Sequence, residues 1–102
     1  MKPLRLEDVP CKYGAPMGRP QSLPENKKTT GTLQLRRVKM IDGDYDEGGA
    51  YWGGGRNVLP LWHAEGDLDG EKFTTRLFVR AGTRAAAKYL IREILPNVRF
   101  YR

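Results

Sequence analysis

Hydrophobic and polar residues alternate most regularly between residues 72 and 81, where the odd-numbered positions are mostly apolar and the even-numbered ones mostly charged or polar. A period of two is typical of a strand with one buried face. The pattern therefore predicts a strand over 72–81. We expect its core face to hold Phe73, Thr75, Leu77, Val79 and Ala81, and its outward face Lys72, Thr74, Arg76, Phe78 and Arg80.

Two further strands are predicted upstream. In residues 32–41, Leu33 and Leu35 share a phase that Val38 and Met40 do not, and a one-residue bulge at Arg36-Arg37 would restore one apolar face. The second strand lies within 57–64, where a proline favours an edge or a strand start. Residues 65–71 then form a hairpin loop with Asp-Gly turn chemistry.

The period changes to that of a helix over 84–95, with Thr83 as N-cap and Pro96 as the stop. Residues 98–102 have strand composition, and a right-handed crossover would make this strand parallel to the first and third. The sequence predicts an α+β fold in the order β-β-β-α-β. An antiparallel three-stranded meander packs against one helix, followed by a terminal strand. The apolar stripe of the helix comprises Ala87, Leu90, Ile91, Ile94 and Leu95.

Residues 1–31 contain prolines at positions 3, 10, 16, 20 and 24 and no lasting period, so we expect an extended, Pro-rich N-terminal arm. Residues 32–102 form a single domain. No segment approaches the roughly 18 apolar residues of a membrane span. A cytoplasmic protein with no membrane partner is the expectation.

Charge is segregated along the chain. The formal net charge is +6, but residues 1–41 carry +6, residues 42–71 carry −7 and residues 72–102 carry +7. Such blocks either create a directional field that steers a polyanion to one face or neutralise one another in the fold.

The third block contains the candidate nucleic-acid-binding residues. Arg76, Phe78 and Arg80 interleave cations with an aromatic ring, as single-strand recognition requires, unless the N-terminal arm covers Phe78. The helix adds a second set at i, i+4, i+8 spacing, which is either a phosphate-binding stripe or a plain solvated face. This second set comprises Arg84, Lys88 and Arg92.

Residues 42–56 combine four acids, three aromatics and six glycines, which predicts a structured loop near Thr83. An anion site at the helix start is one reading, and capping of that start by the loop's own acids is the other. The aromatics either anchor a partner protein or fold over the loop's own core. The candidate protein-binding residues are Tyr45, Tyr51, Trp52 and Arg56.

Known catalytic and metal-binding motifs do not fit. The spacing of Asp42, Asp44 and Asp46 matches the opening of an EF-hand loop, but glutamate stands at position six and glycine at position twelve. The glycine run has no Gly-Lys-Ser/Thr ending. His63 is read as a partly buried strand histidine and Cys11 as a spare thiol. We expect no enzymatic activity, no cofactor and no metal, with a weak, irregular cation site in the acidic loop as the alternative that stays open.

The string Tyr45-Asp46-Glu47-Gly48-Gly49-Ala50-Tyr51-Trp52-Gly53 resembles a group of small uncharacterised proteins from phages and mobile elements. The similarity extends to 13–19, 35–38, 60–62 and 77–81. It implies a phage-encoded accessory protein in the host cytoplasm but no activity. Two hypotheses follow. The chain is a small basic domain that binds DNA or RNA, or it is an interaction module that inhibits a host enzyme through the aromatic glycine-rich loop.

Overall fold

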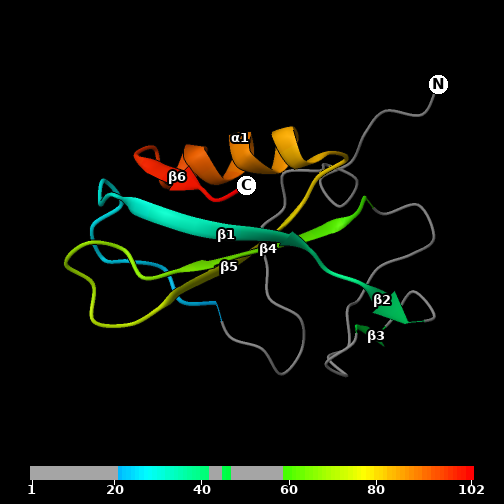
Figure 1. Cartoon of the computed structure of the whole chain (residues 1–102), viewed down its shortest axis with the longest axis horizontal. Helices are drawn as coiled ribbons and strands as arrows, with labels where there is room; N and C mark the ends of the chain where they lie inside the picture. The colour runs from blue at the N-terminus through cyan, green and yellow to red at the C-terminus, as the bar shows by residue number, and fades with distance from the viewer. Residues whose placement is uncertain (1–20, 42–44, 47–58) are drawn as a thin grey trace.

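The computed structural model describes residues 21–41, 45–46 and 59–102. Four strands form one sheet in the order β5-β4-β1-β6, and the helix α1, Arg84–Ile94, covers one of its faces (Figure 1). β4 is antiparallel to β1 and β5, whereas β6 is parallel to β1. The predicted α+β fold and element order are therefore confirmed. The strand bounds are β1 Gly31–Arg37, β4 Leu61–Gly66, β5 Thr75–Arg80 and β6 Val98–Phe100.

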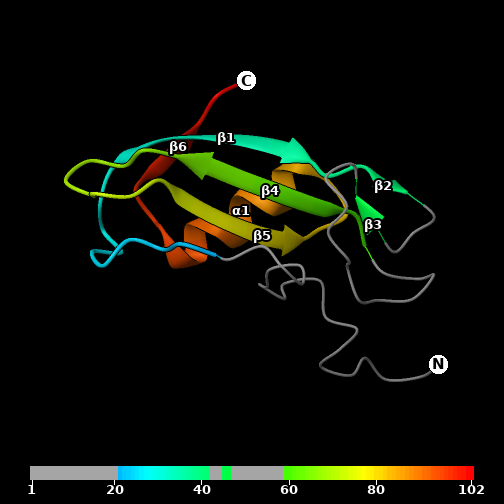
Figure 2. The same cartoon turned by 90° about the horizontal axis from the view of Figure 1, so that it is seen from below.

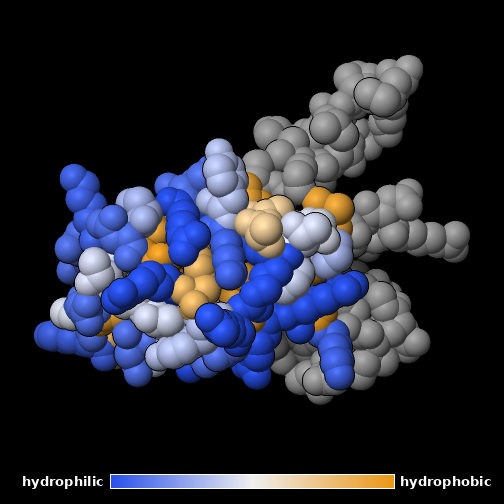
Figure 3. All heavy atoms as spheres, turned by 45° about the horizontal axis from the view of Figure 1, so that its top comes forward, coloured by the Kyte–Doolittle hydropathy of each residue, from blue (hydrophilic) through white to orange (hydrophobic). Residues whose placement is uncertain are grey.

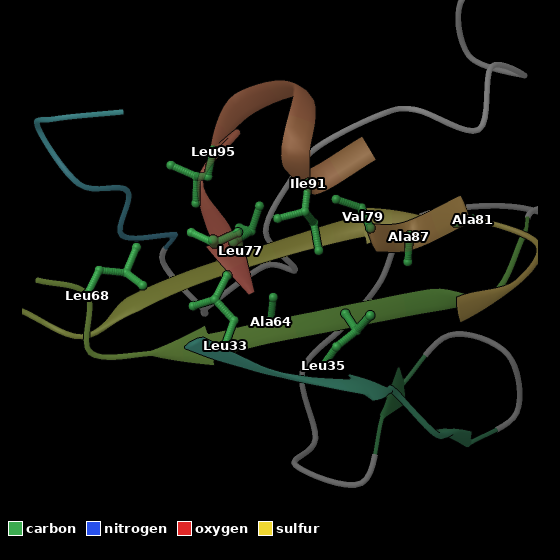
Figure 4. Packing of buried hydrophobic residues seen from close by; sticks show 11 residues of the cluster. Leu33, Leu35, Ala64, Leu68, Leu77, Val79, Ala81, Ala87, Ile91 and Leu95 are labelled. Atoms are coloured by element: carbon green, nitrogen blue, oxygen red, sulfur yellow. The ribbon is translucent and has the colours of Figure 1, made fainter. Parts of the chain in front are cut away.

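The core lies between the sheet and α1, and it is built from the periods seen in the sequence (Figure 4). Thr75, Leu77, Val79 and Ala81 are buried, as their alternation predicts. Phe73 was expected on the same face, but 80% of it is exposed because β5 begins only at Thr75. The helix contributes Ala87 and Ile91, and its C-cap residue contributes Leu95; each is fully buried.

The first strand is shorter than predicted and contains no bulge. The register of β1 with β4 is continuous to the pair Arg37 and Trp62, and β1 ends there. Val38 donates its amide to Leu61 O at 2.8 Å and packs on the sheet face opposite α1. The change of phase at Val38 therefore serves a second apolar cluster. Residues Met40–Ile41 (β2) pair separately with Tyr45–Asp46 (β3).

The second strand begins directly after Pro60, within the predicted range 57–64, and continues to Gly66, two residues into the predicted hairpin loop. The carbonyl of Pro60 accepts a bond from the amide of Ala81 at 3.0 Å, so this proline lies at a strand start, which was one of the two positions expected. The helix start is confirmed. Thr83 Oγ1 accepts from the amide of Ala86 at 3.1 Å, which satisfies one of the free donors of the first turn.

The segment before β1 packs along the outer edge of β5. Ser22 and Arg76 exchange two backbone hydrogen bonds, of 2.9 and 2.8 Å. Pro24, two residues further on, has no amide to donate and cannot extend this pairing. Thr29 is buried and donates to Asp69 O at 2.6 Å. Residues 1–20 of the predicted arm lie outside the described residues.

Candidate nucleic-acid interface

The six predicted nucleic-acid-binding residues divide between two sides of the molecule. Alternation along β5 directs Arg76, Phe78 and Arg80 away from α1, on the sheet face that looks toward the viewer in Figure 2. The other three lie on α1, behind the sheet in that view. The two sets therefore do not form one continuous surface.

The ring of Phe78 is not open for base stacking. Only 3% of this residue is exposed, and it packs with Leu61 and Val38 in the second apolar cluster. Its ring stacks on His63, with centroids 4.6 Å apart and planes inclined by 22°. The prediction that this ring is open to solvent is therefore wrong. Leu61 and Val38 give the ring an apolar surface to pack on, and removing apolar area from water is favourable. His63 is a partly buried strand histidine, as expected.

The two arginines of β5 make contacts within the fold. Arg76 Nε lies 2.7 Å from Glu65 Oε2 in an exposed ion pair. Arg80 is half-buried and donates to Leu59 O at 2.9 Å. Burial lowers the pKa of Arg80 below its usual value, although a guanidinium stays charged at neutral pH. Both guanidinium groups therefore already have a hydrogen-bond partner within the fold.

Arg84 also supports the fold. Its Nη1 donates to Leu35 O at 2.7 Å, and its Nη2 donates to Tyr101 O at 2.6 Å. The parallel pairing of β1 with β6 ends near this point, with the amide of Tyr101 bound to Leu33 O. One guanidinium therefore bridges two carbonyls that the strand ladder leaves open, and it joins the helix start to the sheet.

Lys88 and Arg92 share an aromatic partner. Lys88 Nζ lies 5.8 Å from the ring centroid of Phe100, and Arg92 Cζ lies 5.0 Å from it. Arg92 Nε also donates to Val98 O at 3.3 Å. A cation over a ring keeps its charge, whereas a cation paired with a carboxylate is neutralised. Both side chains are thus held in place as cations.

These two residues belong to a larger surface that we call the basic edge, comprising Lys88, Arg92, Arg99 and Arg102. Arg99 and Arg102 are exposed on and just after β6, the edge strand beside α1. Val98 and Phe100 pack toward α1, so alternation directs Arg99 to the other face of the same edge. Residues 84–102 hold five cations and one acid, Glu93. Hydrophilic side chains predominate over α1 on the face in Figure 3, with hydrophobic atoms in small patches.

The residues predicted from the sequence to bind nucleic acid did not include Arg99, Phe100 or Arg102. Composition showed their block to be basic, but only the sheet order reveals that β6 is an edge strand beside α1. The helical stripe itself was visible from its spacing. Within the described part of the chain, none of the four basic-edge cations forms an ion pair.

Of the four candidate protein-binding residues, one belongs to the part of the chain that the structure describes. Tyr45 lies in β3, while Tyr51, Trp52 and Arg56 lie outside the described residues, as does most of the loop expected near Thr83. The interaction-module hypothesis therefore stays a prediction.

Across the described ranges, no three His, Cys, Asp or Glu side chains gather where they could hold a metal ion. The same residues include no helix with the length and apolarity needed to cross a membrane. No protein-family model, curated protein or solved structure matches this chain.

Proposed function

We propose that this protein is a non-enzymatic nucleic-acid-binding domain, and that the basic edge is its binding surface. The observation that carries the proposal is the position of Lys88 and Arg92 on the ring of Phe100. The shared ring holds the two cations close together, and no carboxylate of the described residues pairs with either of them. A polyanion can therefore bind them without first breaking an ion pair or ordering both side chains.

Charge on the rest of the edge supports the same partner. Arg102 adds a cation just after β6, and Arg99 adds one on the opposite face of the same edge strand. The sole acid of residues 84–102 is Glu93. A field of one sign over an edge raises the local concentration of a phosphate backbone. An accessory role in the host cytoplasm, as the phage resemblance implies, is compatible with this activity and forms part of the proposal.

The test is a salt titration of binding. Fluorescence anisotropy with a labelled oligonucleotide should give measurable affinity at about 50 mM salt and a steep loss toward about 200 mM. In the double variant Lys88→Gln/Arg92→Gln, we expect the slope of log K against log salt to shrink by about 1.4 for a single strand, since each phosphate contact contributes about 0.7.

The matched control is Arg36→Gln/Lys72→Gln, which removes the same charge from two exposed residues away from the basic edge. Arg36 lies in β1 beyond the residues that pair with β6. Lys72 lies in the loop before β5, and β5 and β6 are the two opposite edge strands of the sheet. The control should keep the wild-type slope. No binding by the wild-type chain at about 50 mM salt would rule out the proposed function.

A further inference from the structure

Tyr89 is an exposed aromatic residue that the fold does not use. The core face of α1 is formed by Ala87 and Ile91 and is continued by the C-cap residue Leu95, whereas Tyr89 is 68% exposed on the solvent side. No hydrogen bond or ring contact of Tyr89 occurs within the described residues. A tyrosine left in solvent on a helix gives the fold little, but it offers a flat ring to a partner.

The surroundings of this ring form a shallow hollow of about 360 Å³, lined by Ala85, Lys88, Tyr89, Arg92 and Glu93. Ala85 and Tyr89 are one turn apart, and long helical side chains lean toward the preceding turn. The methyl group at position 85 leaves the space beside the ring unfilled, and a longer side chain there would occupy it. The ring therefore has room for a flat group against it.

Two members of the basic edge border the same hollow. Lys88 precedes Tyr89 in the chain, Arg92 is one turn further on, and the ring of Phe100 holds both cations. An aromatic ring next to two fixed cations matches one nucleotide, because the base stacks on the ring and the phosphates reach the cations. In a duplex the bases are already stacked inside and cannot reach a ring on a helix surface.

We infer that the basic edge selects single-stranded over double-stranded nucleic acid, and that Tyr89 is the residue on which an unpaired base stacks. The inference rests on the proposed function and narrows its ligand. Both RNA and DNA provide a stacking base and a phosphate, so the shared ligand is a single strand of either kind.

The experiment compares Tyr89→Leu with Tyr89→Phe in the full chain. Probes are labelled oligo(dT), labelled oligo(U) and a labelled DNA duplex of equal length. Tyr89→Leu should weaken single-strand binding roughly 5- to 150-fold, the range expected for one lost base stack. It should leave duplex binding unchanged. Tyr89→Phe keeps the ring and should retain wild-type affinity.

The outcomes separate the two proposals. If the wild type binds single strands but Tyr89→Leu binds them equally well, the stacking role is overturned and the proposed function stands. Duplex binding as tight as single-strand binding would overturn the selectivity. Absence of wild-type binding to all three probes would overturn the proposed function and this inference with it.

Discussion

Arg84 and Arg92 lie on one stripe of α1, two turns apart, yet their guanidinium groups have different surroundings. Arg84 bridges the carbonyls of Leu35 and Tyr101, whereas Arg92 lies over the ring of Phe100. Helical spacing predicts that both residues lie on one stripe, but it does not reveal which guanidinium donates hydrogen bonds to the sheet. That depends on where β1 and β6 stop pairing.

Replacing Arg84 tests this division of roles. Arg84→Met should lower the free energy of unfolding by about 1–3 kcal/mol, because two carbonyls lose their donors. Arg84→Lys should recover only part of this loss, since an ammonium cannot reproduce the two-pronged geometry. Urea denaturation measures both values. Unchanged stability of Arg84→Met would show that water replaces the guanidinium at no cost.

At the scale of elements, β5 and α1 were the most predictable parts of the chain. Each carries an uninterrupted period on one buried face, and α1 also has its N-cap at Thr83. The first strand was less predictable because Val38 serves a cluster on the other side of the sheet. A change of phase has two solutions, a bulge or a second core, and local sequence does not choose between them.

Close contact between β4 and β1 depends on Gly66 at the end of β4. A Cβ atom there would lie 2.5 Å from Thr32 O, a backbone atom that cannot move independently. Gly66→Ala should therefore destabilise the protein by about 1–3 kcal/mol, the usual cost of overpacking. Thermal or urea unfolding would measure it.

Gly82→Ala is the matched control for this effect. Its Cβ atom would meet only Leu59 Cδ2, at 4.0 Å, which is an ordinary contact. The control should unfold close to the wild type. Equal stability of Gly66→Ala and Gly82→Ala would mean that the ends of β1 and β4 separate more easily than their pairing indicates.

At the scale of the whole molecule, the sequence predicted the basic character of residues 72–102 but not its division by the sheet. Alternation along β5 directs Arg76 and Arg80 to one face, and the crossover through α1 carries Lys88 and Arg92 to the other side. Residues that are close in the chain can thus be separated by the thickness of the sheet. The six predicted nucleic-acid-binding residues therefore belong to two surfaces, three on β5 and three on α1.

This separation allows a comparison of two variants with the same change in net charge. Lys88→Gln/Arg92→Gln removes two charges from the basic edge, and Arg36→Gln/Arg76→Gln removes two from exposed positions on the opposite sheet face. If binding is localised, the first pair should lose at least about ten times more affinity for a single strand at about 50 mM salt, because only its cations contact phosphate. Anisotropy titrations of both variants against the same labelled oligonucleotide provide the measurement.

The opposite result would be equally informative. Equal losses from the two variants would mean that the protein attracts nucleic acid through its overall charge of +6 and has no defined binding surface. A larger loss from Arg36→Gln/Arg76→Gln would move the binding surface to the sheet face, although Phe78 is buried there. If binding is localised, affinity depends on the cations of the basic edge and hardly on those of the opposite sheet face. The ratio of the two affinity losses measures this difference directly.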